Sequence, residues 1–338
     1  MSSSSVLTAW ENRDKSLWRA SRDGVVRLLR GRHAEDASFK TAWRSRMHID
    51  AHQHFWVFDP LEYAWIDDAM APLRRDFLPA DLRPELQGEG IQGCIAVQAR
   101  QTLAETRWLL ELAKREPWIV GVVGWADLRS PRLRSDLESF GGDPRLVGLR
   151  HIVQDEPDDG FLLQPDFLRG ISLLAELGLA YDILIYPRHL PAAVALASRF
   201  PDQRFVLDHL AKPPIKSGAL LPWGKDIREL AFFPNVYGKL SGLVTEADCH
   251  HWTPDQIRPY LDVAFDCFGP RRLMLGSDWP VCTLAGGYSR VIHVVTDYLA
   301  GCSADERAAV CGGNAENFWR LQPSAPRSLD HRVGKGDA

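Results

Sequence analysis

Two histidines separated by one residue stand at the end of a short apolar run in the first fifth of the chain. The run begins at Met47, and the segment Asp50-Ala51-His52-Gln53-His54 closes it. Successive side chains of a β-strand point to opposite faces, so residues two apart point to the same side. We therefore expect the imidazoles of His52 and His54 to converge on one point, where they could bind a metal ion or assist proton transfer.

A carboxylate follows a second apolar run near the other end of the chain. The segment Leu275-Gly276-Ser277-Asp278-Trp279-Pro280 places Asp278 directly before a Trp-Pro pair. A single His-x-His or Gly-Ser-Asp segment also occurs on ordinary protein surfaces, so neither is informative alone. In a closed barrel the first and last strands are neighbours, and the two histidines would then meet Asp278.

Composition and charge exclude several classes of protein. The chain has 338 residues, of which 45% are hydrophobic and 25% charged, as in ordinary globular proteins. No run approaches the roughly 18 apolar residues of a membrane span. Residues 1–46 hold ten Lys and Arg against five Asp and Glu, which leaves a net charge of -9 on residues 47–338 and no basic surface for nucleic acid. The six cysteines form no Cys-x-x-Cys pair and are typical of free thiols in a reducing compartment, the cytoplasm.

The first 46 residues differ in composition from the rest. They open with Met-Ser-Ser-Ser-Ser, are rich in Arg and lack the apolar core of a secretory signal. Their acidic residues argue against an organelle-targeting segment, and Met47 is an alternative start of translation. We expect residues 1–46 to be a poorly packed extension, disordered or a mis-assigned start. Residues 47–321 are expected to form a single domain, and residues 322–338 a solvated tail.

Eight short apolar runs alternate with helical patterns in residues 47–321. The predicted strands are Met47–His52, Gly93–Gln98, Ile119–Ala126, Leu146–His151, Ala180–Tyr186, Arg204–His209, Asn235–Leu240 and Arg272–Ser277. The predicted helices are Leu103–Arg115, Pro131–Phe140, Pro165–Glu176, Leu190–Phe200, Lys225–Phe232, Thr253–Phe268 and Gly287–Ala300. This alternation predicts a (β/α)8 TIM barrel. A doubly wound open sheet is the alternative, but no Gly-x-Gly-x-x-Gly follows any of the runs.

Active sites of such barrels lie at the C-terminal ends of the strands. Four of the eleven histidines fall at predicted strand ends, namely His52, His54, His151 and His209. Each could be an ordinary structural histidine. Their placement together with Asp278 favours one shared site.

Six segments in this order resemble the amidohydrolase superfamily, in its amidohydrolase 2 branch, and within it the sugar-acid lactonases. The segments are Asp50-Ala51-His52-Gln53-His54-Phe55-Trp56, Ile95-Ala96-Val97-Gln98-Ala99-Arg100, Gly148-Leu149-Arg150-His151, Val206-Leu207-Asp208-His209, Lys239-Leu240-Ser241-Gly242 and Met274-Leu275-Gly276-Ser277-Asp278-Trp279-Pro280. The resemblance covers residues 47–321 and is greatest to L-fuconolactonases, ahead of L-rhamnonolactonases and pyrone-dicarboxylate lactonases. It implies a hydrolase that opens a sugar-acid lactone.

Lactone hydrolysis needs a general base and groups that polarise the carbonyl, and residues at the strand ends could supply both. Asp278 is the expected general base, which takes a proton from water and later returns it to the ring oxygen. His52, His54, His151 and His209, with Arg150 nearby, would polarise the carbonyl group. Arg150 cannot act as a base at neutral pH, and a structural salt bridge is its alternative role.

The resemblance does not decide whether the enzyme uses a metal ion. A single zinc ion could be bound by His52, His54, His209 and Asp278, with one position left for water. Two-metal members of the superfamily carry a lysine at the end of the fourth strand, where this chain has His151, so a two-metal site is disfavoured. Some lactonases of this branch work without metal, and we keep both alternatives.

The predicted substrate-binding residues are Trp56, Gln98, Arg150, Lys239 and Trp279, with Arg188 and Glu246 as further candidates. Two other tryptophans, Trp65 and Trp125, are expected in the core. The expected partner is a small lactone, and the oligomeric state is left open. The alternatives are a metal-dependent decarboxylase of the same superfamily, a lactonase for non-sugar lactones and a non-catalytic carbohydrate-binding barrel.

Overall fold

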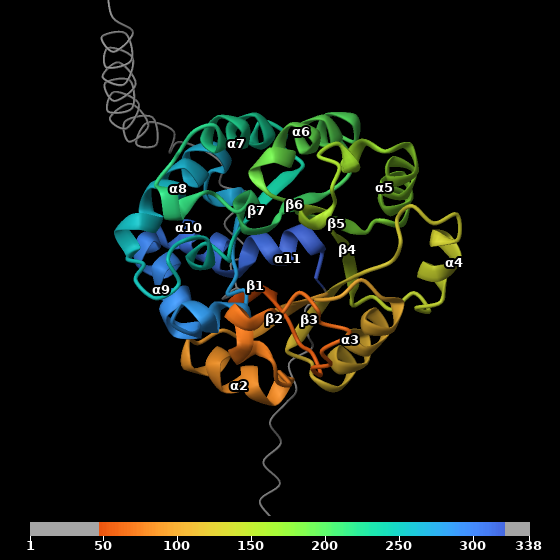
Figure 1. Ribbon diagram of the computed structural model, residues 1–338, viewed down its shortest axis with the longest axis horizontal. Helices are drawn as coiled ribbons and strands as arrows, with labels where there is room; N and C mark the ends of the chain where they lie inside the picture. The colour runs from red at the N-terminus through yellow and green to blue at the C-terminus, as the bar shows by residue number, and fades with distance from the viewer. Residues whose placement is uncertain (1–46, 322–338) are drawn as a thin grey trace, which may run out of the picture. The chain divides into compact units, whose positions relative to one another are not determined.

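The computed structural model describes residues 47–321, in which eight parallel strands form one sheet in sequence order (Figure 1). The strands are β1 (Ile49–Gln53), β2 (Gly93–Val97), β3 (Ile119–Gly124), β4 (Leu146–Ile152), β5 (Ala180–Leu184), β6 (Phe205–Leu207), β7 (Val236–Leu240) and β8 (Leu273–Leu275). Two backbone hydrogen bonds close the ring: the N–H of His54 donates to Trp279 at 2.7 Å, and that of Asp278 to His52 at 2.8 Å. The predicted TIM barrel is confirmed, and the open-sheet alternative is wrong.

Helices surround the strands (Figure 1). They are α2 (Pro79–Gly88), α3 (Leu103–Arg115), α4 (Leu133–Glu138), α5 (Pro165–Leu177), α6 (Leu190–Arg199), α7 (Trp223–Ala231), α8 (Pro254–Phe268), α9 (Tyr288–Tyr298), α10 (Ala304–Ala308) and α11 (Asn314–Trp319). The sequence did not predict α2, α10 or α11. Two prolines and only two buried leucines weaken the apolar period of α2, and two glycines interrupt the pattern between α10 and α11.

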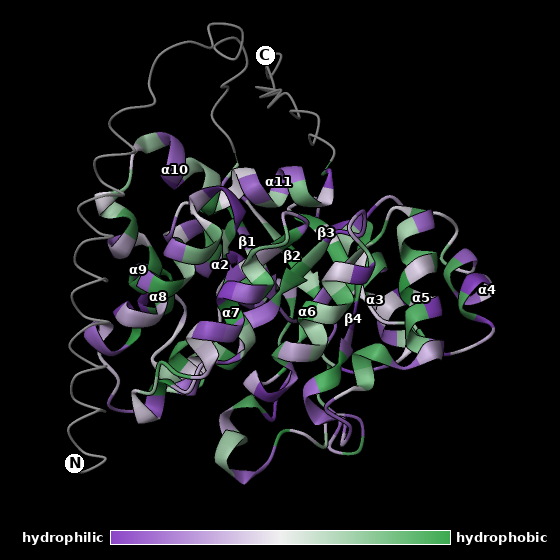
Figure 2. Ribbon diagram, turned by 90° about the horizontal axis from the view of Figure 1, so that it is seen from above, coloured by the Kyte–Doolittle hydropathy of each residue, from purple (hydrophilic) through white to green (hydrophobic). Residues whose placement is uncertain are grey.

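The barrel has two hydrophobic layers. The inner layer consists of small and branched side chains from the strands together with Phe318 and Trp319 of α11, and the outer layer fills the space between strands and helices. Accordingly α11 lies across the middle of the ring in Figure 1. Figure 2 shows mostly hydrophobic strands and helices that also carry hydrophilic residues. None of the helices within residues 47–321 is both long and apolar enough to cross a membrane.

Several predicted strands were too long at their C-terminal ends. β6 ends at Leu207 because His209 adopts a left-handed backbone with φ of 52°, and a strand cannot continue through it. β8 ends at Leu275, before Asp278, whose φ of 59° is also left-handed. The functional residues at these ends therefore lie on turns that leave the sheet.

Candidate active site

Three imidazoles surround the carboxylate of Asp278. Oδ1 of Asp278 lies 3.6 Å from Nε2 of His52, 3.4 Å from Nε2 of His54 and 3.9 Å from Nε2 of His209. The Nε2 atoms of His52 and His54 are 3.2 Å apart, as expected for side chains on the same face of β1. Residues at the ends of the first, sixth and eighth strands thus meet at one point, as we expected from the sequence.

Asp50 binds the first strand to the last beneath this cluster. Its buried carboxylate accepts hydrogen bonds from the hydroxyl and N–H of Ser277, at 2.6 and 2.9 Å, and from Tyr288 at 3.1 Å. The N–H of His52 also donates to it at 3.1 Å. Burial raises the pKa of Asp50 to about 6 in spite of these donors. This carboxyl fixes the distance between the strand that carries His52 and the turn that carries Asp278.

The turn after β6 is strained. The four residues from His209 to Lys212 all have φ between 50° and 59°, and none is glycine. A left-handed backbone costs L-residues about 1 kcal/mol or more each. The turn is held by Trp223, whose indole N–H donates to the Leu210 carbonyl at 2.8 Å, and by a 2.9 Å hydrogen bond between Nδ1 of His209 and the Ser241 hydroxyl. Such strain is typical of functional sites, and here it aims His209 at Asp278.

A network of buried charges lies under His52. Nζ of Lys239 on β7 is 2.5 Å from Asp182 on β5 and 2.9 Å from Asp208 after β6, and all three side chains are fully buried. Nδ1 of His52 lies 3.4 Å from Asp208 and 3.3 Å from Lys239. Lys239 also lies 5.2 Å from the ring centre of Trp319 on α11. The predicted substrate-binding lysine is therefore in the barrel interior, where it supports His52 from below.

Sequence reasoning assigned no role to Asp182 or Asp208. Burial raises the pKa of Asp182 to about 7. Burial also acts to raise the pKa of Asp208, but Lys239, His52 and Arg150 together hold it well below its usual range. The signal in the sequence was a charged residue within an apolar strand, since a buried charge needs a partner.

Arg150 and Gln98 form a second buried pair beside His52. Nη1 of Arg150 is 3.0 Å from Asp208 and 3.3 Å from Nε2 of His52. Its Nη2 donates to both the carbonyl and the side-chain oxygen of Gln98, and Nε2 of Gln98 donates to the Arg150 carbonyl at 3.2 Å. The structure thus brings both predicted residues to the cluster, and it also shows the salt bridge, to Asp208, that was the alternative role of Arg150.

His151 is not part of the Asp278 cluster. Its Nε2 lies 2.7 Å from Glu156, its Nδ1 accepts the indole N–H of Trp125 at 3.4 Å, and its ring stacks on Phe161 at 4.9 Å. Burial lowers the pKa of His151, although Glu156 opposes this shift. A catalytic role for His151 stays a prediction.

The two tryptophans predicted to bind substrate, Trp56 and Trp279, pack among other aromatic side chains. Trp56 packs against Phe77 with ring centres 5.3 Å apart and donates its indole N–H to the Arg75 carbonyl at 2.8 Å. The ring of Trp279 packs on the same Phe77 at 5.3 Å. Both tryptophans are buried in this aromatic cluster. Arg188 is paired with Asp159 at 2.9 Å, among exposed side chains.

The cluster keeps Asp278 ionised. Burial acts to raise its pKa, but His209, His54 and His52 hold it below its usual range. Burial lowers the pKa of His209 to about 4. At neutral pH the centre therefore combines a carboxylate with a neutral His209, a set that can accept a proton, donate hydrogen bonds or bind a cation.

The donor set fits one divalent metal ion. His52, His54 and Asp278 each offer one ligand atom, and these atoms lie within 4.8 Å of one another. Two imidazoles and one carboxylate are typical zinc ligands. A second group combines His52 with Asp208 and His209, but Asp208 already neutralises Lys239 and Arg150. The first group is the better site for a cation, with His209 beside it.

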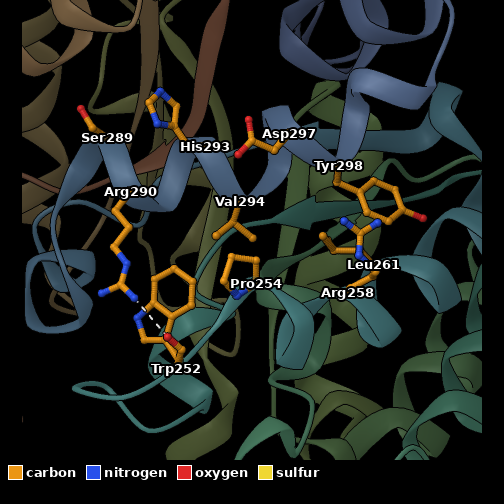
Figure 3. Close-up of a pocket in the computed structure, with 10 residues that line it drawn as sticks. All are labelled: Trp252, Pro254, Arg258, Leu261, Ser289, Arg290, His293, Val294, Asp297 and Tyr298. Atoms are coloured by element: carbon orange, nitrogen blue, oxygen red, sulfur yellow. Dashed lines mark hydrogen bonds between the residues drawn. The ribbon is translucent and has the colours of Figure 1, made fainter.

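A cavity of about 410 Å³ lies elsewhere, between α8 and α9 on the outside of the barrel. Figure 3 shows its lining, in which Nη2 of Arg290 donates to the Trp252 carbonyl at 3.0 Å. None of the predicted site residues lines it. Its chemistry is separate from that of the strand ends.

The fold and the site define a TIM-barrel enzyme with histidines at the ends of β1 and β6 and an aspartate after β8. The chain belongs to the amidohydrolase family, whose model matches residues 49–321. This match confirms the family predicted from the sequence.

Among curated relatives, L-fucono-1,5-lactonases from Burkholderia ambifaria and Burkholderia multivorans are 43% and 42% identical to the chain. The matches span 81% and 84% of this chain and 95% and 99% of those proteins. A solved amidohydrolase from Burkholderia multivorans with bound zinc superposes with a TM-score of 0.80 at 43% identity, over 82% of this chain and all of that one.

Proposed function

We propose that this enzyme hydrolyses sugar-acid lactones, with L-fucono-1,5-lactone as the first candidate substrate. The observation that carries the proposal is the ionised carboxylate of Asp278 among three imidazoles at the C-terminal end of the barrel. The L-fucono-1,5-lactonases that share 42–43% of its residues over nearly their whole length supply the substrate class. The buried free thiols Cys94 and Cys282 support a place in the reducing cytoplasm.

The reaction adds water to the lactone carbonyl and breaks the bond to the ring oxygen. Asp278 accepts a proton from the attacking water and returns it to the ring oxygen as that bond breaks. Neutral His209 donates a hydrogen bond from Nε2 to the carbonyl oxygen as it gains negative charge. The product acid ionises at neutral pH, so each opened ring releases one proton. A bound divalent ion held by His52, His54 and Asp278 would polarise the carbonyl group further.

The buried network below the site supports these roles. Asp208, Lys239 and Arg150 surround His52 at distances of 3.3–3.4 Å, which fixes its ring against the barrel floor. Reacting groups that are already oriented need no reorganisation during the reaction, and this contributes to catalysis.

A metal-dependent decarboxylase of the same superfamily is the rival function. Solved 2,6-dihydroxybenzoate decarboxylases are similar in fold, with a TM-score of 0.58 at 13% identity for one of them. That likeness shows the fold alone. Release of carbon dioxide from hydroxybenzoates, without opening of any lactone, would favour the rival.

A pH-indicator assay over a panel of lactones tests the proposal. We expect fast proton release with L-fucono-1,5-lactone and related aldonolactones, and slow release with butyrolactone. Inversion of one hydroxyl should lower kcat/KM more than loss of the C6 methyl group, because a site that hydrogen-bonds a hydroxyl discriminates against its absence far more strongly than an apolar pocket discriminates against a missing methyl group. Equal rates for butyrolactone and sugar lactones would reduce the assignment to a lactonase of another class.

A further inference from the structure

Three polar side chains from neighbouring strand ends meet beside the Asp278 cluster. They are Tyr186 after β5, Lys212 after β6 and Glu246 after β7. Nζ of Lys212 lies 3.9 Å from Oε1 of Glu246 and 5.2 Å from the ring centre of Tyr186. Lys212 has no part in the hydrolysis proposed for Asp278 and His209.

The Lys212–Glu246 pair lies nearer to solvent than the catalytic cluster. Side-chain exposure rises from 0% at His52 to 8% at Asp278, 19% at Lys212 and 24% at Glu246. All four residues are at the ends of strands or on the turns that follow them, so this increase follows the direction from the barrel floor to its mouth. Lys212 and Glu246 are thus more exposed than the Asp278 cluster at the same end of the barrel.

Both side chains retain free hydrogen-bonding capacity. Their 3.9 Å separation exceeds a hydrogen bond, and within residues 47–321 neither the ammonium of Lys212 nor the carboxylate of Glu246 takes part in another one. Burial raises the pKa of Glu246, which Lys212 opposes and the nearby Asp278 reinforces. The ammonium can donate to a hydrogen-bond acceptor of a ligand, and the carboxylate can accept from a donor of the same ligand.

The backbone fixes Lys212 relative to the catalytic histidine. Lys212 ends the left-handed turn that begins at His209, and its N–H donates to the His209 carbonyl at 2.8 Å. Gly242, on the loop that leads to Glu246, lies so close to the His209 ring that a Cβ there would collide with it. One strained turn therefore positions both a catalytic side chain and Lys212, which is unlike an exposed lysine on a helix.

We propose that Lys212 and Glu246 form the subsite that reads two neighbouring hydroxyls of a polyhydroxylated lactone ring. The ammonium of Lys212 donates to one hydroxyl oxygen, and the carboxylate of Glu246 accepts the O–H of the next. The ring of Tyr186 holds the ammonium in place through a cation–π contact. This assignment rests on the proposed function and names the residues that select the substrate.

The test compares Lys212→Met and Glu246→Gln with the wild-type enzyme on two six-membered lactones. L-fucono-1,5-lactone carries hydroxyls, whereas δ-valerolactone carries none and is measured as a substrate or as a competitive inhibitor. The matched control is Lys225→Met, which breaks a 3.5 Å ion pair with Glu229 on the surface of α7. Neither test variant removes a group that acts on the reacting atoms.

For the sugar lactone we expect KM to rise at least about 10-fold in either variant while kcat stays within about threefold. The constants for δ-valerolactone and those of the control should stay unchanged. Equal losses on both lactones, a fall in kcat at constant KM, or no change at all would overturn the subsite. A wild-type enzyme that opens no sugar lactone would instead refute the proposed function, and the subsite with it.

Discussion

Glu105 is a buried acid whose protonation should make the stability of the enzyme depend on pH. It lies in the first turn of α3, where Thr102 caps the helix by accepting the N–H of Glu105 at 3.1 Å. Its carboxyl group accepts the N–H groups of Ala99 and Arg100, at 3.1 and 2.9 Å, and so holds the chain that follows β2. Burial raises its pKa from 4.5 to about 7 in spite of these donors.

The sign and size of the effect follow from this shift. Because the pKa is higher in the folded state, folding binds a proton between the two pKa values. The stabilisation from this group is complete below pH 4.5 and is lost as the pH rises to about 7. The difference corresponds to about 3 kcal/mol of unfolding free energy.

The substitution Glu105→Gln isolates this contribution, because glutamine resembles the protonated carboxyl in shape and charge. Urea unfolding of both proteins between about pH 5 and about pH 8 should show the wild type losing about 2.5 kcal/mol relative to the variant. Glu111→Gln, an exposed position on the same helix, is the control and should give a constant difference. A constant difference for Glu105→Gln as well would refute a buried proton at this site.

Three further changes test the packing around His209, the buried ion pairs and the N-terminal segment. Gly242→Ala should displace the His209 ring, since φ at this glycine is 61° and a Cβ would collide with the ring; we expect kcat to fall at least about 10-fold in initial-rate assays, and an unchanged rate would contradict the packing. Lys239→Met should lower the unfolding free energy in urea by about 3–5 kcal/mol, with partial recovery when Asp182→Asn is added; no recovery would show that the two charges are independent. Deletion of residues 1–46 should leave melting temperature and turnover unchanged, and a large loss of either would show that the segment is part of the folded unit.

The strand alternation and the residues at strand ends were predictable from the sequence. His52 and His54 share a face because the period of a strand is two, and near-continuous apolar runs identify strands buried on both sides. In a closed barrel the first and last strands are neighbours, so the predicted fold alone placed Asp278 beside the two histidines.

The buried ion pairs and the aromatic packing were not predictable in the same way. Lys239 and Asp182 come from strands that are not adjacent, and which charge neutralises which depends on the layers inside the barrel. Trp56 stands two residues after His54, but its ring packs on Phe77 among other aromatic side chains and not beside the histidines. Lys212 was missed because four non-glycine residues in a left-handed turn leave no clear sequence signal.

The most direct test of the account is the opening of L-fucono-1,5-lactone by the wild-type enzyme and by Asp278→Asn, side by side. Asparagine tolerates the left-handed backbone at this position, so the fold should survive, as a melting curve would verify. Metal content is measured in both proteins, because Asp278 is also a candidate ligand. We predict one proton released per ring by the wild type and a fall in kcat/KM of about 10² to 10⁴ in the variant. Wild-type activity no faster than spontaneous hydrolysis, or a variant that keeps more than about a tenth of the activity, would contradict the account.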